Sequence, residues 1–397
     1  MKKISKILAL MLIMAMLSMM VVGCGGGDKP AETPEPAETT ETAETEETTE
    51  PAEEEPAEPV EEEPAETAEE EPATVPIAIT DDFEAVEGTV AMITDVGGIN
   101  DESFNQSSWN GLEALQERGA TVSFIESQKE ADYEPNLDTK ITEGNDLIWG
   151  VGFMMKGAVE EASLDYPEQK FALIDDFWDD GALPNVTGVT FAAEESSFLV
   201  GYIASYMTET DRVGLVLGME SPTMNGFTNG YFAGVHYGAK EQGKEIQTDY
   251  VVIESFGDSA LGKATANKMF SDGCDIVFHA AGGAGIGVIE AAKEMDKWAI
   301  GVDLDQNYLA PDNVLTSALK NVNVATESVS AAILRGEDLG GKTVHFGLVE
   351  GGVGIAPSSD KHVPADILAK TAEVEEKIIA GEIVVPKTAE GLEEFKK

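Results

Sequence analysis

Cysteine, histidine and basic residues are all scarce in this chain of 397 residues. It has two cysteines, Cys24 and Cys274, and four histidines. Two cysteines exclude a site built from several thiolates, and no two histidines have the spacing of metal ligands, so we expect no metal site. Lys and Arg number 25 against 75 Asp and Glu, a formal net charge of −50. Because phosphates are bound by clustered Lys and Arg, this balance argues against a nucleic-acid partner.

The common catalytic and cofactor-binding motifs are also missing. The sequence has no Gly-x-Ser-x-Gly elbow and no His-Glu-x-x-His helix. The glycine-bearing stretch 280–287 lacks the Gly-Lys-Ser/Thr ending of a phosphate-binding loop, and its glycine spacing does not fit a dinucleotide fingerprint. Carboxylates are so abundant that no acid/base pair stands out. We therefore predict no enzymatic activity and no cofactor.

The N-terminus has the pattern of an export signal. Basic residues are followed by an apolar run over 7–22 and then by Gly23 and Cys24. Residues 21–24 resemble the lipobox of bacterial lipoproteins, which implies cleavage of a signal peptide, 1–23, and attachment of diacylglycerol to Cys24. An uncleaved membrane anchor is the alternative, although the run falls short of the roughly 20 residues needed to span a bilayer. On either interpretation the rest of the chain is exported and held at the outer face of the cell membrane.

An acidic segment follows, composed mainly of Pro, Ala, Glu and Thr between residues 28 and 82. It has almost no aliphatic or aromatic side chains to bury, so we expect a disordered tether over 24–84, extended by proline and charge repulsion. A tail that binds cations or a partner is the alternative. Cys274, the second cysteine, follows Gly273 and precedes an apolar run, which predicts a small buried core residue.

The remainder alternates short apolar runs with helical patterns, which is typical of parallel sheets with crossover helices. Strands are expected at 90–93, 122–126, 147–151, 171–174, 186–190, 213–217, 250–253, 276–278 and 299–301. So many strands exceed one compact domain, and we predict an α/β protein of two doubly wound lobes. The expected helices include 103–115 and 196–208, and a tail helix over 365–380 that packs outside.

In such lobes, ligands bind at the carboxyl ends of the strands. The candidate ligand-binding residues stand in those loops: Asp95, Asn100, Asp101, Ser103, Phe104, Asp175, Phe256, Gly282, Gly283, Asp303 and Lys320. Carboxylates and amides bond to hydroxyl groups, and phenyl rings stack on flat ones. With one cation among them, this set favours a flat, oxygen-rich, neutral ligand such as a nucleoside over a phosphorylated one.

Several of these residues also have a purely structural interpretation. Asp95 and Asp101 are compatible with helix capping and loop bonding. Phe256, like Phe227, fits a core position equally well. Gly282 and Gly283 allow close approach of the backbone to a ligand or to a neighbouring strand. His279 is a structural or pocket residue.

The opening motif resembles a known family. Thr94-Asp95-x-Gly97-Gly98-x-Asn100-Asp101-x-Ser103-Phe104-Asn105-Gln106, followed by Trp109, is similar to the start of the basic membrane protein (Bmp, PnrA-like) family of substrate-binding lipoproteins of ABC importers. The later stretches that fit this family's pattern are 133–137, 151–153, 171–175, 195–202, 226–234, 280–283, 301–306, 315–317 and 352–354.

This resemblance implies a type I periplasmic-binding-protein fold, with two lobes joined by three crossovers, divided here into 85–191 plus 312–343 and 192–311 plus 344–397. It implies that a purine nucleoside is bound without being altered and is passed to a permease and its ATPase. It also implies that Phe104 stacks on the base, that Asp95 belongs to the site, and that Asp303 and Lys320 hold ribose hydroxyls. A second stacking aromatic is Phe256, Phe227 or Phe278.

We expect a monomer that is anchored to the membrane only through its lipid. Two other functions stay open at this stage. One is a protein of the same fold that binds another small polar ligand, such as a sugar, or acts as a sensor. The other is an extracytoplasmic enzyme, for example a nucleoside hydrolase.

Overall fold

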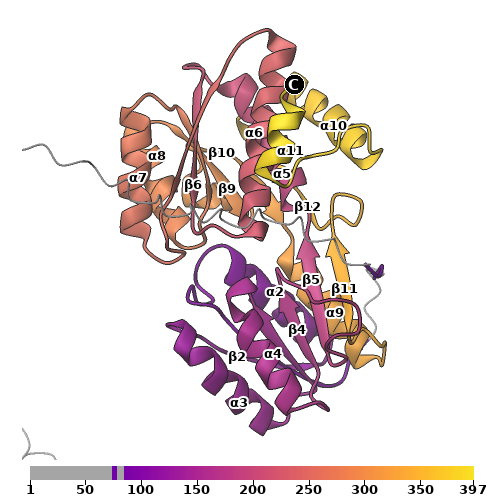
Figure 1. Ribbon diagram of the computed structural model, residues 1–397. Coiled ribbons are helices and arrows are strands. Elements are labelled where there is room, and N and C mark those ends of the chain that lie inside the picture. Colours follow the sequence, from indigo (N-terminus) through magenta and orange to yellow (C-terminus); the bar gives the residue numbers. More distant parts are fainter. Residues whose placement is uncertain (1–73, 78–84) are drawn as a thin grey trace, which may run out of the picture. The chain divides into compact units, whose positions relative to one another are not determined.

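Two six-stranded sheets organise the computed structural model, which describes residues 74–77 and 85–397 (Figure 1). The first sheet has the order β11-β5-β4-β3-β1-β2, and all of its strands are parallel. These strands are β1 (Thr89–Ile93), β2 (Thr121–Ile125), β3 (Leu147–Val151), β4 (Phe171–Ile174), β5 (Val186–Phe191) and β11 (Lys342–Phe346). β1, β3 and β4 are continuous apolar runs because helices cover both faces of the sheet.

The second sheet has the order β12-β10-β9-β8-β6-β7, with only β12 antiparallel to its neighbour. Its strands are β6 (Arg212–Leu217), β7 (Gln247–Val252), β8 (Ile276–Ala280), β9 (Trp298–Asp303), β10 (Val314–Lys320) and β12 (Val353–Ile355). Each of the nine strands predicted from the sequence is present, with bounds that differ by up to three residues. The two-lobed α/β prediction is therefore confirmed.

Helices pack on both faces of each sheet. The first sheet is covered on one face by α2 (Phe104–Glu117) and α9 (Val322–Leu334), and on the other by α3 (Tyr133–Glu143) and α4 (Lys156–Asp165). The second is covered by α5 (Ala193–Met207) and α6 (Pro222–Gln242) on one face, and by α7 (Ser259–Ser271) and α8 (Ala284–Met295) on the other. Cys274 is fully buried in the α7/α8 core as a free thiol, as predicted.

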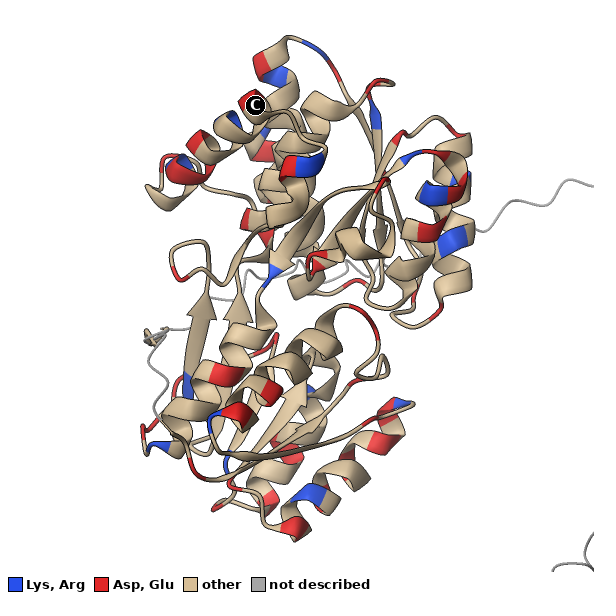
Figure 2. Ribbon diagram, turned by 180° about the vertical axis from the view of Figure 1, so that it is seen from behind, with Lys and Arg blue, Asp and Glu red and all other residues tan. Residues whose placement is uncertain are grey.

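The C-terminal tail closes over the second lobe. The predicted tail helix is α10 (Ala365–Ile379), which packs on α5, and α11 (Ala389–Phe395) packs on α6. Short 3-10 helices complete the described elements: η1 (Glu130–Asp132), η2 (Phe153–Met155), η3 (Gln306–Leu309) and η4 (Pro357–Lys361). Asp and Glu residues are spread along the ribbon of both lobes, with Lys and Arg residues interspersed (Figure 2). Within 74–77 and 85–397, none of the helices combines the length and hydrophobicity needed for a membrane span.

The chain passes between the lobes three times: from β5 to α5, from β10 to α9, and from β11 to β12. The division expected from the sequence differs from the sheets at two of these crossings. It assigns 312–343 to the first lobe, whereas β10 lies in the second sheet, between β9 and β12. It assigns 344–397 to the second lobe, whereas β11 continues to Phe346 beside β5. The reason is that the second crossing follows Lys320, where no proline or glycine marks the boundary.

The predicted tether also differs from the structure at one point. Thr74 forms a bridge to Thr343 of β11, and the amide of Val75 donates to the Thr343 carbonyl at 2.9 Å. Val75 and Ile77 pack against the core of the first lobe, because they are apolar side chains beside an open sheet edge. The predicted signal peptide, Cys24 and the rest of the tether lie outside the described residues.

Candidate functional site

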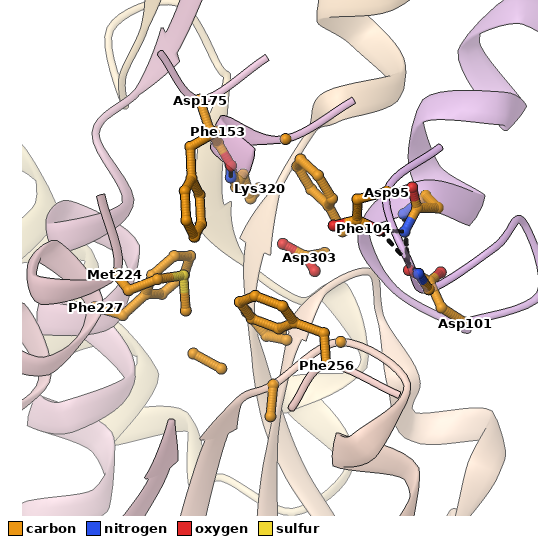
Figure 3. Close-up of a pocket in the computed structure, with 17 residues that line it drawn as sticks. Asp95, Asp101, Phe104, Phe153, Asp175, Met224, Phe227, Phe256, Asp303 and Lys320 are labelled. Carbon is orange, nitrogen blue, oxygen red and sulfur yellow. Dashed lines mark hydrogen bonds and ion pairs between the residues drawn. The ribbon is translucent and has the colours of Figure 1, made fainter. Parts of the chain in front are cut away.

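A pocket lies where the carboxyl ends of the strands of both sheets meet (Figure 3), and its empty space, including the part that is open to solvent, is about 510 Å³. Loops after β1, β3 and β4 contribute from the first lobe, and loops after β6, β7, β8 and β9 from the second. Its lining residues are Asp95, Gly97, Asp101, Phe104, Asn105, Gly152, Phe153, Asp175, Met224, Phe227, Phe256, Ala280, Ala281, Gly282, Val302, Asp303 and Lys320. The pocket therefore combines apolar walls with a few polar groups, as small-molecule sites do.

Asp95, Asp101 and Asn105 form a bonded cluster at the start of α2. The Asn105 side-chain amide donates to Asp95 at 2.7 Å and to Asp101 at 3.0 Å. The Asp101 carboxylate also accepts the backbone amides of Ser103, Asn105 and Gln106. Asp101 thus caps the helix, which was the structural interpretation of this residue, and it also lines the pocket.

This cluster leaves an acceptor without a protein partner. Asn105 is 2% exposed, and its Oδ1 atom has no hydrogen bond within the described part of the chain. A buried acceptor of this kind costs free energy unless another group donates to it. Burial raises the pKa of Asp95 to about 6, against the bonds from Gly97 and Asn105, and burial likewise raises the pKa of Asp101. This end of the pocket therefore favours a ligand that donates hydrogen bonds.

Lys320 and Asp175 form an ion pair across the two lobes. The Lys320 ammonium lies 2.5 Å from Asp175 Oδ2, and both side chains are almost completely buried. Lys320 Nζ also lies 4.6 Å from the centre of the Phe104 ring and 5.8 Å from that of Phe227. Desolvation raises the pKa of Asp175, and the attraction of Lys320 opposes that rise. The other oxygen, Asp175 Oδ1, has no partner within the described residues.

Asp303, at the end of β9, is the second carboxylate that faces Lys320. It accepts a hydrogen bond from the Ser103 hydroxyl of the opposite lobe. Burial raises its pKa to about 7, although the nearby Lys320 charge and the Ser103 bond act in the opposite direction. Asp303 and Asp175 both have positive φ, 62° and 70°, which is unusual outside glycine and is found at binding sites.

Four phenylalanines supply the flat apolar surfaces. Phe104 and Phe153 come from the first lobe, and Phe227 and Phe256 from the second. Phe153 and Phe256 meet edge to face, with ring centres 6.4 Å apart. Gly152 has φ of +104°, and a Cβ atom there would lie 3.3 Å from Asp95 Oδ2 and 3.4 Å from Phe104. Gly152 therefore leaves room for the two groups that define one wall.

Eight of the eleven candidate residues line this pocket: Asp95, Asp101, Phe104, Asp175, Phe256, Gly282, Asp303 and Lys320. The other three do not. Asn100 is exposed and lies outside the lining, so its amide does not contribute to the pocket in this conformation. Ser103 is buried and bonds to Asp303 instead. Gly283 lies behind the wall, where an added Cβ would approach the Phe256 carbonyl and Asp101.

Several lining residues were not among the eleven candidates, notably Asn105, Phe153 and Met224, and Phe227 was named only as an alternative for the second stacking ring. Phe153, Met224 and Phe227 follow predicted strands, so their position was a usable signal, but an apolar side chain in a loop is equally compatible with the core. His279 is completely buried, and burial lowers its pKa to about 4. Within 74–77 and 85–397, no group of three or more His, Cys, Asp or Glu residues is arranged to hold a metal ion.

The fold and the pocket define the class of two-lobed solute-binding proteins. In agreement, the structure is similar to the crystal structure of ABC transporter system solute-binding proteins from Aeropyrum pernix K1. The TM-score is 0.70, with 30% sequence identity, and the match covers 77% of this chain and 95% of that one.

The family follows from the sequence comparisons. Residues 88–389 match the family described as ABC transporter substrate-binding protein PnrA-like, or Bmp, and the chain belongs to it. The chain is 37% identical over 328 residues to the CD4+ T-cell-stimulating antigen of Listeria innocua, covering 77% of this chain and 90% of the relative. It is 38% identical over 312 residues to basic membrane protein A of Borreliella burgdorferi, covering 78% and 90%.

The resemblance of the opening motif is thereby confirmed. Proteins of this family bind their substrates without transforming them, so the chain is a substrate-binding protein of an ABC transporter and not an enzyme. Substrate-binding proteins of ABC transporters act outside the cytoplasm, which agrees with the export signal at the N-terminus.

Proposed function

We propose that this protein captures a purine nucleoside between its lobes. The observation that carries the proposal is the combination of four phenyl rings with four aspartates in one pocket of about 510 Å³. A purine base offers two flat faces to the rings, and a ribose offers hydroxyl groups that donate to carboxylates. Of the four rings, Phe104 is our choice for stacking on the base, and Phe256 lies on the opposite lobe.

The polar groups without protein partners support a ligand that donates several hydrogen bonds. Asn105 Oδ1 and Asp175 Oδ1 are both buried acceptors in the pocket wall. Asp303 and Lys320 face each other nearby, and we assign them to the ribose hydroxyls, one accepting and the other donating. Asn105, Asp95 and Asp101 then meet the donor groups at the far end of the ligand.

The charge of the pocket argues against phosphorylated ligands. Four aspartates surround one lysine among the lining residues, and that lysine is already paired with Asp175. A nucleotide phosphate would enter a negative site with no free cation to receive it, at a large desolvation cost. We therefore expect discrimination between a nucleoside and its 5′-phosphate.

Closure and delivery complete the proposed function. The ligand bridges the two lobes and stabilises the closed form through contacts with both. The closed protein, a monomer held at the membrane by a lipid on Cys24, then delivers the ligand to a permease driven by an ATPase. The export signal and the lipobox pattern support this anchoring.

Mass spectrometry of the small molecules released when the natively purified protein is denatured tests the ligand class. We expect a purine nucleoside in close to equimolar amount. Calorimetry with purine nucleosides, pyrimidine nucleosides, sugars and nucleoside 5′-phosphates then ranks the ligands. Release of a sugar together with no heat from any nucleoside would contradict the proposal in favour of a carbohydrate-binding member of the fold. Appearance of free base during incubation would contradict capture without chemistry.

A further inference from the structure

Glu102 stands in the middle of the loop that presents pocket residues, yet it is held from the opposite lobe. The Gln306 side-chain amide donates to the Glu102 carbonyl at 2.8 Å, and the Tyr308 hydroxyl donates to the Glu102 carboxylate. Gln306 and Tyr308 both belong to η3 of the second lobe. Neither is among the residues that line the pocket. The two bonds therefore join the lobes beside the pocket rather than across it.

The Glu102 backbone needs this support. Its φ is +54°, a conformation that a residue with a side chain adopts only at a cost. Its neighbours in the chain are Asp101, which lines the pocket, and Ser103, which bonds to Asp303, with Phe104 one position further on. A relaxation of Glu102 would consequently displace the carboxylate, the hydroxyl and the ring that follow one another along this loop.

Gln306 is oriented for this bond by other groups. Its Oε1 atom accepts the Val302 backbone amide at 3.0 Å and lies 3.0 Å from His279 Nε2. A backbone amide can only donate, so Oε1 is the acceptor at this position and the amino group must face Glu102. Gln306 is completely buried, so none of these bonds is exchanged for one to water.

The space around Gln306 depends on glycine. A Cβ atom on Gly301 would lie 2.6 Å from Gln306 Oε1 and 2.5 Å from Ser317 Oγ. A Cβ atom on Gly285 would lie 1.9 Å from His279 Nδ1. The glutamine and the imidazole therefore occupy room that any larger residue at those positions would remove.

We propose that Gln306 and Tyr308 are positioning residues for ligand capture, holding the loop Asp101–Phe104 in its binding conformation already in the unliganded protein. They act through Glu102 and do not touch the ligand. The inference that this affects nucleoside affinity rests on the proposed function. The positioning of the loop itself does not, because it is measurable without a ligand.

The first measurement is hydrogen exchange in the unliganded protein. Tyr308→Phe removes one bond, and Gln306→Glu replaces the amino donor while keeping an acceptor for Val302. We expect the amides of Ser103, Asn105 and Gln106, which bond to Asp101, to exchange about fivefold faster in each variant, the fold-change expected for one lost hydrogen bond. Tyr250→Phe, an exposed tyrosine of β7 outside the pocket lining, is the matched control and should leave them unchanged.

The second measurement is nucleoside affinity in a double-mutant cycle. Tyr308→Phe and Glu102→Ala should each weaken binding by about fivefold, and the double variant should be no weaker than the single ones, because both remove the same bond. Equal melting temperatures for the single variants and the wild type would separate this effect from a general loss of stability.

The outcomes distinguish the positioning role of Gln306 and Tyr308 from the proposed nucleoside ligand. Unchanged exchange in the loop of both variants overturns the positioning role. Faster exchange in both variants, together with a wild-type protein that binds no nucleoside, contradicts the proposed ligand and leaves the positioning role standing. If Gln306→Glu fails to fold, Tyr308→Phe still decides, because the Tyr308 side chain is 54% exposed and its hydroxyl is at the surface.

Discussion

Lys320 illustrates how a single residue combines structural and binding roles. Its ammonium is paired with Asp175 of the other lobe and lies over the faces of Phe104, Phe191 and Phe227. A buried cation is stabilised only by such partners. The sequence marked Lys320 as the one cation among the candidate residues. It did not show that Asp175, more than a hundred residues away, would be its partner.

The ring of Phe104 is the residue whose removal tests the stacking assignment. We expect Phe104→Ala to weaken nucleoside binding by at least about tenfold, because a base–aromatic stacking contact contributes on the order of 1–3 kcal/mol. Calorimetry at fixed salt measures it. Phe124→Ala is the matched control, since Phe124 is 36% exposed and packs edge-on against Trp109, outside the pocket lining. Equal affinity of Phe104→Ala and the wild type would exclude stacking on this ring.

At the scale of elements, the placement of α2 determines the geometry of the site. This helix begins at Phe104, directly after the loop with Asp101, and it packs against α9 of the same lobe. The contact is close because Gly111 has no side chain. A Cβ atom there would lie 2.1 Å from Thr326 Oγ1 and 2.2 Å from the Asn323 carbonyl. Since α9 directly follows the crossing at Lys320, this contact couples α2 to the hinge.

Gly111→Ala should therefore destabilise the protein by about 1–3 kcal/mol, the usual cost of overpacking a core. We also expect weaker ligand binding, because α2 must shift and takes Phe104 with it. Gly157→Ala in α4 is the matched control. No heavy atom lies within 4 Å of a Cβ there, so alanine should be neutral or stabilise by about 0.5–1 kcal/mol. Thermal unfolding of both variants measures the difference, and equal destabilisation would contradict the importance of the α2–α9 contact.

At the scale of the whole molecule, acidity dominates. The chain carries 75 acidic against 25 basic residues, and four aspartates are buried together in one pocket. Ionised carboxylates in such a site are poorly solvated because they are buried, and they also repel one another, which is why the pKa values of Asp95 and Asp303 rise to about 6 and about 7. Ligand donors and Lys320 are the groups that relieve this repulsion.

This burial predicts a pH dependence of stability. Both pKa values lie above the ordinary value of 3.8, so between that value and about pH 7 the folded state binds more protons than the unfolded one. Stability of the unliganded protein should then increase as the pH falls from 8 to 5. Asp303→Asn removes one of these groups and should flatten the slope and weaken nucleoside binding at pH 8. A wild-type melting temperature that decreases steadily as the pH is lowered from 8 to 5 would contradict the prediction.

The fold was predictable because its signal is local. Runs such as 147–151 and 171–174 are apolar at every position, and only strands buried on both faces tolerate that pattern. The loops at the carboxyl ends of such strands converge at one edge of each sheet. For that reason eight of the eleven candidates, which were chosen from these loops, line one pocket. Asn100 lies outside the pocket lining. A polar side chain in this loop can point toward the pocket or toward solvent, and a loop has no periodicity from which to predict the direction.

The sequence alone thus determined the two-lobed α/β fold, nine of the twelve strands that the structure describes and the acidic, aromatic character of the site. These depend on composition and on patterns a few residues long. Only the tertiary structure decided which lobe owns β10 and β11, that Lys320 pairs with Asp175, that Ser103 supports Asp303, and that Gln306 and Tyr308 reach Glu102. The physical reason is that these contacts join residues up to 206 positions apart, and the three crossings that bring them together leave no periodic mark in the chain.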